Sequence, residues 1–147
     1  VLHPGLQRLL DVRRVLQLRN PAHSLVKLLL PCQGQQVLVT SYTHPEYALT
    51  MEAVLCKRQT TALLLRGTEG EAVADPRRLP RMVSIVRGTR TVLEPQSGPL
   101  TSLPLLPRDC SVDSTVRYID SVLRGKVPVP QPIVLQLERI VELALGG

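Results

Sequence analysis

Hydrophobic residues near the start of the chain recur at intervals of three and four. Residues 6–18 place leucine and valine at this spacing among arginines, which predicts an amphipathic helix. Pro21 disfavours helical backbone in the residue before it, so a turn follows. The apolar run over 24–30 (SLVKLLL) then predicts a second, shorter helix. The chain therefore opens with two helices joined by a turn.

The next segment changes from helical to strand-like patterning and back. Residues 36–42 (QVLVTSY) and 61–66 (TALLLR) are short apolar runs that predict strands. A helix is predicted over 44–58, with Thr43 as its N-cap and Glu46 completing a capping box. Its apolar side is formed by Ala48, Met51, Val54 and Leu55. This order predicts a βαβ unit, and strands that are apolar on both faces indicate a buried parallel sheet.

The middle of the chain is polar and then strand-like. Residues 68–81 (TEGEAVADPRRLPR) predict a loop, and residues 82–93 predict a hairpin that turns near Gly88. Four prolines over 94–109 predict irregular structure. With the βαβ unit, the hairpin predicts a small sheet of about four strands.

Two further helices are predicted at the end of the chain. In residues 111–123 an apolar residue recurs every three or four positions, which predicts a helix with one apolar face. Gly125 predicts the end of this helix. That face is formed by Val112, Val116, Ile119 and Leu123. After a proline-rich link, a last helix is predicted over 132–145. The fold class is therefore α/β, with residues 1–147 in a single domain.

Composition narrows the possible functions. Of 147 residues, 44% are hydrophobic, which is enough to form a core. The aromatic residues are three tyrosines, without Phe or Trp, which excludes modules that stack bases on aromatic platforms. No apolar run approaches the roughly 20 residues of a membrane span, so we expect no membrane association. Three widely spaced cysteines do not form a zinc motif and predict a reducing, cytoplasmic compartment.

The net charge of the chain is positive, and most of its basic residues are arginines. The formal net charge is +6, and 15 of the 18 basic residues are Arg. Arginine binds phosphate in bidentate fashion, so a nucleic-acid partner is one interpretation. A compositional bias towards arginine is the other, because net charge by itself does not specify a partner.

Several motifs occur in an order that is known from one enzyme family. They are HPGLQRLLDVRRVLQLR, SLVKLLLP, QVLVTSYTHPEYALTMEAVL, TALLLRGTEG and DSTVRYIDSVLRGKVPVPQPIVLQLERIVELALGG. Together they resemble, along almost the whole chain, anthranilate phosphoribosyltransferases of glycosyltransferase family 3. The resemblance implies the C-terminal portion of the nucleoside phosphorylase/phosphoribosyltransferase catalytic-type domain, a βαβ unit plus hairpin with flanking helices. The upstream helical domain and the first half of the α/β domain would be absent, so the chain is expected to be a fragment.

The residues of three segments resemble one branch of that fold more closely. RNPAHSLVKLL, SYTHPEY and RGTEGE are similar to YbiB-type proteins, a DNA-binding branch. This resemblance implies a homodimer that binds nucleic acid without sequence preference.

The transferase alternative depends on whether the chain keeps the residues that the family uses for phosphoribosyl pyrophosphate and Mg²⁺. In the enzymes an adjacent Asp-Glu pair holds the metal, and hard carboxylate oxygens suit Mg²⁺. That pair is missing here, and the remaining acids nearby that could hold a metal are Glu69, Glu71 and Asp75. Arg13 matches the family's substrate-carboxylate arginine. We therefore expect no catalytic residues, no metal and no cofactor, with a Mg²⁺-dependent phosphoribosyl or glycosyl transferase as the alternative.

Binding of a nucleic-acid backbone needs clustered cations, which gain affinity by releasing counterions. Two clusters qualify, one on the first two helices and one around the proline loop and hairpin. Arg66 and His44 follow neighbouring strands and are expected to face one cleft, since ligands of α/β sheets lie at the carboxyl ends of strands. The candidate residues are Arg13, Arg14, Arg19, His23, Lys27, His44, Arg66, Arg77, Arg78 and Arg81, with Arg87 and Arg90 placed in the second cluster.

Overall fold

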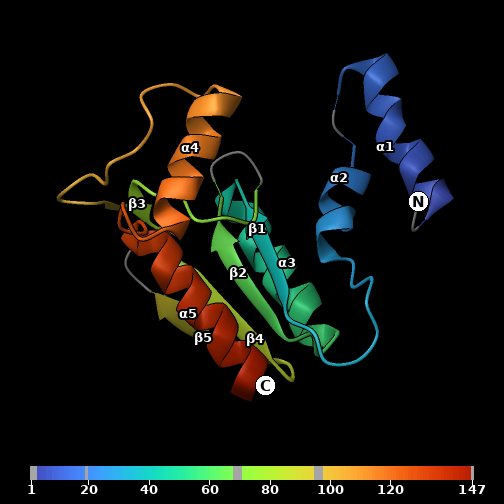
Figure 1. Ribbon diagram of the computed structural model, residues 1–147. Coiled ribbons are helices and arrows are strands. Elements are labelled where there is room, and N and C mark those ends of the chain that lie inside the picture. The colour runs from blue at the N-terminus through green and yellow to red at the C-terminus, as the bar shows by residue number, and fades with distance from the viewer. Residues whose placement is uncertain (1–2, 19, 68–70, 95–97, 147) are drawn as a thin grey trace.

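The computed structural model describes residues 3–18, 20–67, 71–94 and 98–146. In this part of the chain, four strands form the central sheet in the order β1-β2-β4-β5. They are β1 (Leu38–Tyr42), β2 (Ala62–Arg66), β4 (Met82–Val86) and β5 (Thr89–Glu94). Helices α3 (Pro45–Lys57) and α5 (Gln131–Gly146) lie beside the sheet (Figure 1).

The predicted βαβ unit is confirmed. Strands β1 and β2 pair in parallel, with Leu38 opposite Ala62, and α3 connects them. Strands β4 and β5 are both antiparallel to their neighbours, so the sheet is mixed rather than wholly parallel. The α/β fold class is thus correct, and the parallel arrangement holds for the first pair.

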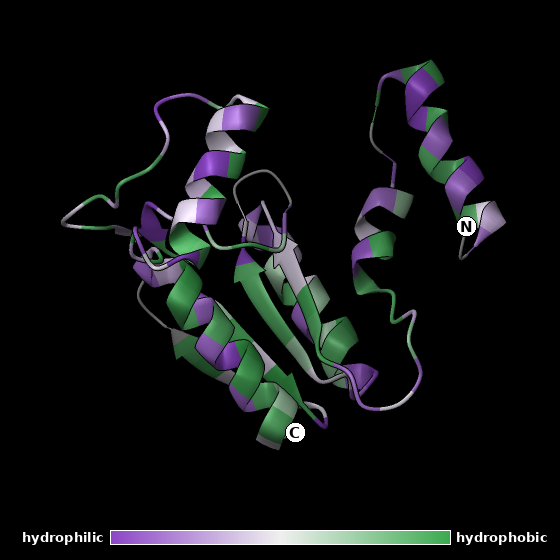
Figure 2. Cartoon of the chain, in the orientation of Figure 1, coloured by the Kyte–Doolittle hydropathy of each residue, from purple (hydrophilic) through white to green (hydrophobic). Residues whose placement is uncertain are grey.

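The core has two halves, one on each face of the sheet. Successive residues of β2 alternate between them, because side chains of a strand point to opposite faces. Ala62 and Leu64 pack on the α3 side with Leu55, whereas Leu63 and Leu65 pack on the α5 side. Figure 2 shows this hydrophobic concentration along β2 and β4. Each fully buried leucine contributes about 1.5–3 kcal/mol of transfer free energy.

The predicted hairpin is also confirmed, and its turn has the expected chemistry. Val86 pairs with Thr89, and the two residues between them have positive φ, 48° at Arg87 and 79° at Gly88. This is the conformation of a type I′ turn, whose twist matches that of the strands. A Cβ on Gly88 would also lie 3.2 Å from the carbonyl oxygen of Cys56. Glycine therefore suits this position both for its positive φ and for the close backbone contact.

The predicted capping box of α3 is wrong. The N-cap is His44 rather than Thr43, and no side chain caps this helix end. The Thr43 hydroxyl instead lies 2.9 Å from Nδ1 of His44. Pro45 takes the first helical position, where a missing N–H costs nothing, and this moves the helix start by one residue.

A small second sheet forms within segments whose composition predicts a loop and irregular structure. Strand β3 (Arg78–Leu79) pairs antiparallel with β6 (Gly98–Pro99). The amide of Leu100 also donates to the carbonyl oxygen of Arg77 at 3.1 Å. These bonds hold the basic loop before β4 against the proline-rich segment.

The remaining helices are α1 (Pro4–Leu16), α2 (Ala22–Leu25), the 3₁₀ turn η1 (Val26–Leu28) and α4 (Val112–Leu123). Helix α1 lies apart from the sheet and meets α2 (Figure 1). The four apolar residues predicted to share one face of α4 are 49–81% exposed, and only residues on its other side are half-buried. Among the described residues, none of the helices has the length and hydrophobicity that a membrane crossing requires.

Candidate functional site

A cavity of about 180 Å³ opens at the carboxyl ends of β1 and β2. The loop that leads from β2 to β4 forms its other wall. It is lined by Thr43, Arg66, Gly67, Asp75, Arg78, Leu79 and Pro80. In α/β sheets this edge is where ligands bind, because parallel strands and their following loops converge there. The cavity therefore lies where the strand order predicts a site.

Gly67 makes the sharp exit from β2 possible. Its amide donates to the carbonyl oxygen of Tyr42 at 2.9 Å, which extends the β1–β2 ladder by one bond. A Cβ at this position would lie 2.8 Å from the carbonyl oxygen of Glu71 and 3.0 Å from Oγ of Ser41. The chain after β2 thus folds back closely over the end of β1, and no larger residue fits without displacement.

Asp75 and Arg77 form a tight pair at the mouth of the cavity. Both carboxylate oxygens of Asp75 accept from the Arg77 guanidinium, at 2.9 and 3.0 Å, and the Arg77 amide donates to Oδ1 at 2.9 Å. The hydrogen bond from the Arg77 side chain lowers the pKa of Asp75 below its ordinary value, which keeps the carboxylate charged. This arrangement is an Asx turn closed by an ion pair.

The other arginines at this edge have no such partner. Arg66, Arg78 and Arg81 are exposed, and within the described residues none of them forms a hydrogen bond or ion pair through its guanidinium. We call Arg66, Arg77, Arg78 and Arg81 the carboxyl-edge arginines. With Asp75 neutralising one charge, the surface around the cavity is positive and three guanidiniums have free donors.

A buried glutamine on α5 holds the loop that leads to Arg77, Arg78 and Arg81. Oε1 of Gln136 accepts from the amide of Ala74 at 2.8 Å, and its Nε2 donates to the carbonyl oxygen of Ala72 at 2.7 Å. Gln136 is 5% exposed and Ala74 is 2% exposed. The side chain thus replaces backbone pairing for a loop that has none at this point.

Lys27 lies at the edge of the sheet rather than inside the cavity. Its Nζ donates to the carbonyl oxygen of Ser41 at 3.3 Å. That carbonyl points away from β2, because Tyr42 is the residue whose carbonyl faces it. Lys27 therefore covers the exposed edge of β1, one way in which proteins protect an edge strand.

The remaining candidates of the first cluster lie elsewhere. Arg13 and Arg14 are exposed on α1, where Arg14 lies 3.6 Å from Asp11, and this helix is separate from the sheet. Arg19 lies outside the described residues. His23 makes local contacts with Asn20, since its Nδ1 lies 3.3 Å from the Asn20 amide.

The second predicted cluster is divided by the structure, and its grouping was wrong. Arg87 lies in the hairpin turn, and Arg90 donates to Glu52 of α3 at 2.5 Å. Because β4 runs antiparallel to β2, this turn lies at the end of the sheet opposite to Arg66. Arg87 and Arg90 therefore do not belong with the carboxyl-edge arginines.

His44 adjoins the cavity without lining it. It contacts the Thr43 hydroxyl, and its ring meets that of Tyr47 edge-on at 5.8 Å. Of the weaker metal candidates, Glu71 is exposed and Glu69 lies outside the described residues. In the described part of the chain, no three His, Cys, Asp or Glu side chains come together as a metal site.

Gln136 is the site residue that sequence reasoning missed, and Asp75 was considered only as a metal ligand beside Glu69 and Glu71, not as the partner of Arg77. The spacing of Asp75 two residues before Arg77 is a signal for an Asx turn that was available in the sequence. Gln136 carried no such signal, because it is a single polar residue on an otherwise amphipathic helix, more than 60 residues from the loop that it holds.

The chain is thus an α/β protein whose carboxyl sheet edge carries a cavity and a positive surface. A comparison with models of known protein families finds no match. The chain is similar to "Uncharacterized protein YbiB" of Escherichia coli (strain K12), with 34% identity over 136 residues. The match covers 91% of this chain and 42% of that protein, so the chain spans less than half of its relative's length.

Proposed function

We propose that the chain binds the phosphate backbone of DNA or RNA, without sequence preference, through the carboxyl-edge arginines. The observation that carries this proposal is the placement of Arg66 and Arg78 on one cavity, both without an ion-pair partner in the described chain. Free guanidiniums bind phosphate strongly and in bidentate geometry. The net charge of +6 acts in the same direction.

The way in which the chain would recognise nucleic acid follows from its side chains. The carboxyl-edge arginines project from a loop and a strand end, and the described residues that line the cavity include no aromatic ring. Contacts to phosphate oxygens carry no base information, so sequence preference is not expected. The resemblance to YbiB-type proteins supports the same proposal. It also supports a nucleoside phosphorylase/phosphoribosyltransferase type of fold and a homodimer of the full-length protein. The cytoplasmic location is supported by the three widely spaced cysteines.

The proposal is tested by fluorescence anisotropy with several unrelated duplexes of about 20 base pairs. We expect the double variant Arg66→Gln and Arg78→Gln to weaken binding roughly equally for all duplexes, by about tenfold or more. The matched control is Arg124→Gln at the C-terminal end of α4. Arg124 is exposed, forms an ion pair with Asp120 and does not line the cavity. Equal affinity in the double variant and the control would place the binding surface elsewhere, with the Arg13 and Arg14 face as the next candidate.

The transferase alternative requires Mg²⁺ and phosphoribosyl pyrophosphate. The described carboxylates do not fit such a metal site, because no three of them with His or Cys come together and both oxygens of Asp75 are occupied by Arg77. Mg²⁺-dependent release of pyrophosphate from phosphoribosyl pyrophosphate would nevertheless favour the transferase over the binding protein.

A further inference from the structure

The exposed apolar face of α4 has a specific spacing. Its four residues follow one another at intervals of four, three and four positions, which is the spacing of the a and d positions in a coiled coil. They are Val112, Val116, Ile119 and Leu123. All four are 49–81% exposed. Within the described chain, α4 therefore presents the contact surface of a coiled-coil helix without the second helix.

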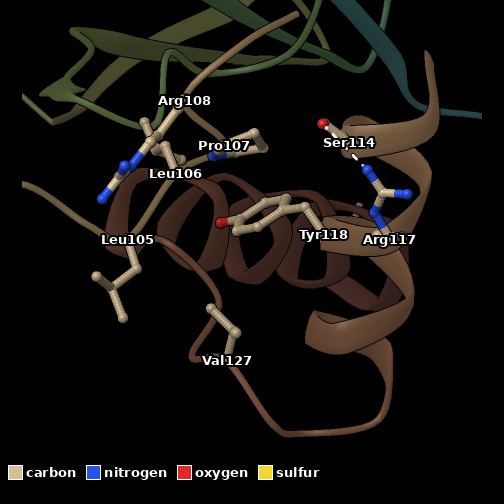
Figure 3. A pocket seen from close by; sticks show the side chains of 8 residues that line it. All are labelled: Leu105, Leu106, Pro107, Arg108, Ser114, Arg117, Tyr118 and Val127. Carbon is tan, nitrogen blue, oxygen red and sulfur yellow. Dashed lines mark hydrogen bonds between the residues drawn. The ribbon is translucent and has the colours of Figure 1, made fainter. Parts of the chain in front are cut away.

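The other side of α4 shows which way this apolar row faces. Ser114 and Tyr118 line the hollow between α4 and the proline-rich segment, where they lie near Pro107 (Figure 3). The Tyr118 hydroxyl is buried. Because these two residues face the rest of the molecule, the apolar row on the opposite side of α4 faces outwards.

Helix α1 carries a row with the same spacing. Its members again follow one another at intervals of four, three and four positions, and they are Gly5, Leu9, Val12 and Leu16. Leu9 and Leu16 are 56% and 61% exposed. Helix α1 has 13 residues and α4 has 12, so the two rows match in length. In one copy of the chain the rows do not meet, because α1 and α4 lie apart, on either side of β1 (Figure 1).

The charges beside the two rows are opposite in sign. In a coiled coil, the e and g positions flank the apolar row and select the partner helix. The charged residues at these positions are Arg8 and Arg13 on α1, and Asp113 and Asp120 on α4. Antiparallel pairing of two α1 helices would place arginine beside arginine, and pairing of two α4 helices would place aspartate beside aspartate. The charges therefore favour α1 against α4.

We propose that the chain self-associates by packing α1 of one copy antiparallel against α4 of a second copy. In this arrangement Leu9 lies opposite Ile119 of the second copy, and Arg13 faces Asp113. Neither Arg13 nor Asp113 forms an ion pair within the described residues of one copy, so both are available for this contact. A two-fold axis repeats the contact with the helices exchanged, and the assembly closes as a dimer.

This dimer goes beyond the binding of nucleic acid and does not depend on it. None of the residues of the two rows, and none of the charged residues beside them, lines the cavity at the sheet edge. The test is therefore made without DNA or RNA, so that its failure and the failure of nucleic-acid binding are separate results.

Sedimentation velocity of the intact chain tests the association. We expect a reversible monomer–dimer equilibrium with a Kd of about 1–100 µM, because contacts between short helices lie at the weak end of the range for interfaces. Ile119→Asp puts an unpaired charge at the centre of the contact and is expected to raise the Kd at least about 100-fold. The matched control is Leu49→Asp, at an apolar residue of α3 that is 72% exposed, and it is expected to leave the Kd unchanged. Circular dichroism checks that both variants keep the helix content of the wild type.

The ion pair tests which helix is the partner. Arg13→Glu is expected to raise the Kd about tenfold, because each dimer contains the pair twice and each pair contributes about threefold. The control Arg14→Glu makes the same change at the next residue, whose side chain is 83% exposed and lies off the apolar row, and is expected to leave the Kd unchanged. Adding Asp113→Arg to Arg13→Glu restores opposite charges and is expected to return the Kd to the wild-type value.

Three results would each overturn the proposal. The first is a wild-type chain that stays monomeric up to about 1 mM. The second is an equal Kd for Ile119→Asp and Leu49→Asp, which would place the contact on another surface. The third is a combined variant of Arg13→Glu and Asp113→Arg that associates no more tightly than Arg13→Glu alone.

Discussion

The hydrogen bonds of Gln136 make the basic loop dependent on α5, and the variant Gln136→Leu removes them with little change in side-chain volume. Two backbone groups lose their partner, the Ala74 amide and the Ala72 carbonyl. Ala74 is 2% exposed, so its amide cannot reach water and bears the full cost of about 1–3 kcal/mol. Ala72 is half-buried, and water replaces part of its bond. We therefore expect a loss of about 2–3 kcal/mol in the free energy of unfolding.

Urea denaturation, followed by circular dichroism at constant pH, measures this loss. The matched control is Gln35→Leu, because Gln35 also donates to a backbone carbonyl of α5, that of Ala144 at 3.0 Å, but is exposed. This control is expected to change the free energy of unfolding by less than about 0.5 kcal/mol. The reasoning is refuted if Gln136→Leu lies within the same small range, since the buried amide would then have found another partner.

Two further variants probe the same edge of the sheet. Gly67→Ala places a Cβ 2.8 Å from the Glu71 carbonyl oxygen. We therefore expect the free energy of unfolding to fall by about 1–3 kcal/mol in the same urea assay. An unchanged urea midpoint would show that the loop moves aside without cost. The pKa of Asp75 is lowered from 3.8 by Arg77, so its contribution is present above that pH and is lost as pH falls through the lowered value. Asp75→Asn is therefore expected to lose less stability than wild type on acidification below about pH 4. Parallel pH profiles of the two proteins would contradict this assignment.

Local patterns in the sequence predicted most of the elements, and each for an identifiable reason. The apolar runs at β1 and β2, with a helix between them, predicted the βαβ unit correctly. Such runs can be recognised from neighbouring residues alone, without knowledge of the tertiary structure. The hairpin could also be predicted from the sequence, since Gly88 suits the positive φ of a two-residue turn. The pairing of β3 with β6 was not predictable, because the two strands are only two residues long and are separated in sequence by the β4–β5 hairpin.

The candidate site was predicted in part. Arg66 was expected to face a cleft with His44, and Arg78 was expected in the second basic cluster. The structure instead places Arg66 and Arg78 on one cavity, which His44 does not line. Arg87 and Arg90 were grouped with them because they are close in sequence, but an antiparallel strand carries them to the other end of the sheet. On α4, periodicity correctly placed four apolar residues on one face, but it contains no information about what packs there, and that face is exposed. Sequence spacing therefore predicted local geometry better than tertiary neighbours.

The dependence of nucleic-acid affinity on salt concentration tests the central proposal most directly. Each phosphate contact adds about −0.9 to the slope of log K against log salt for B-DNA. If Arg66 and Arg78 both contact phosphates, the double variant Arg66→Gln and Arg78→Gln shows a slope that is shallower by about two, while Arg124→Gln keeps the wild-type slope. A wild-type chain without measurable DNA affinity at low salt, or a double variant with an unchanged slope, would contradict the proposal.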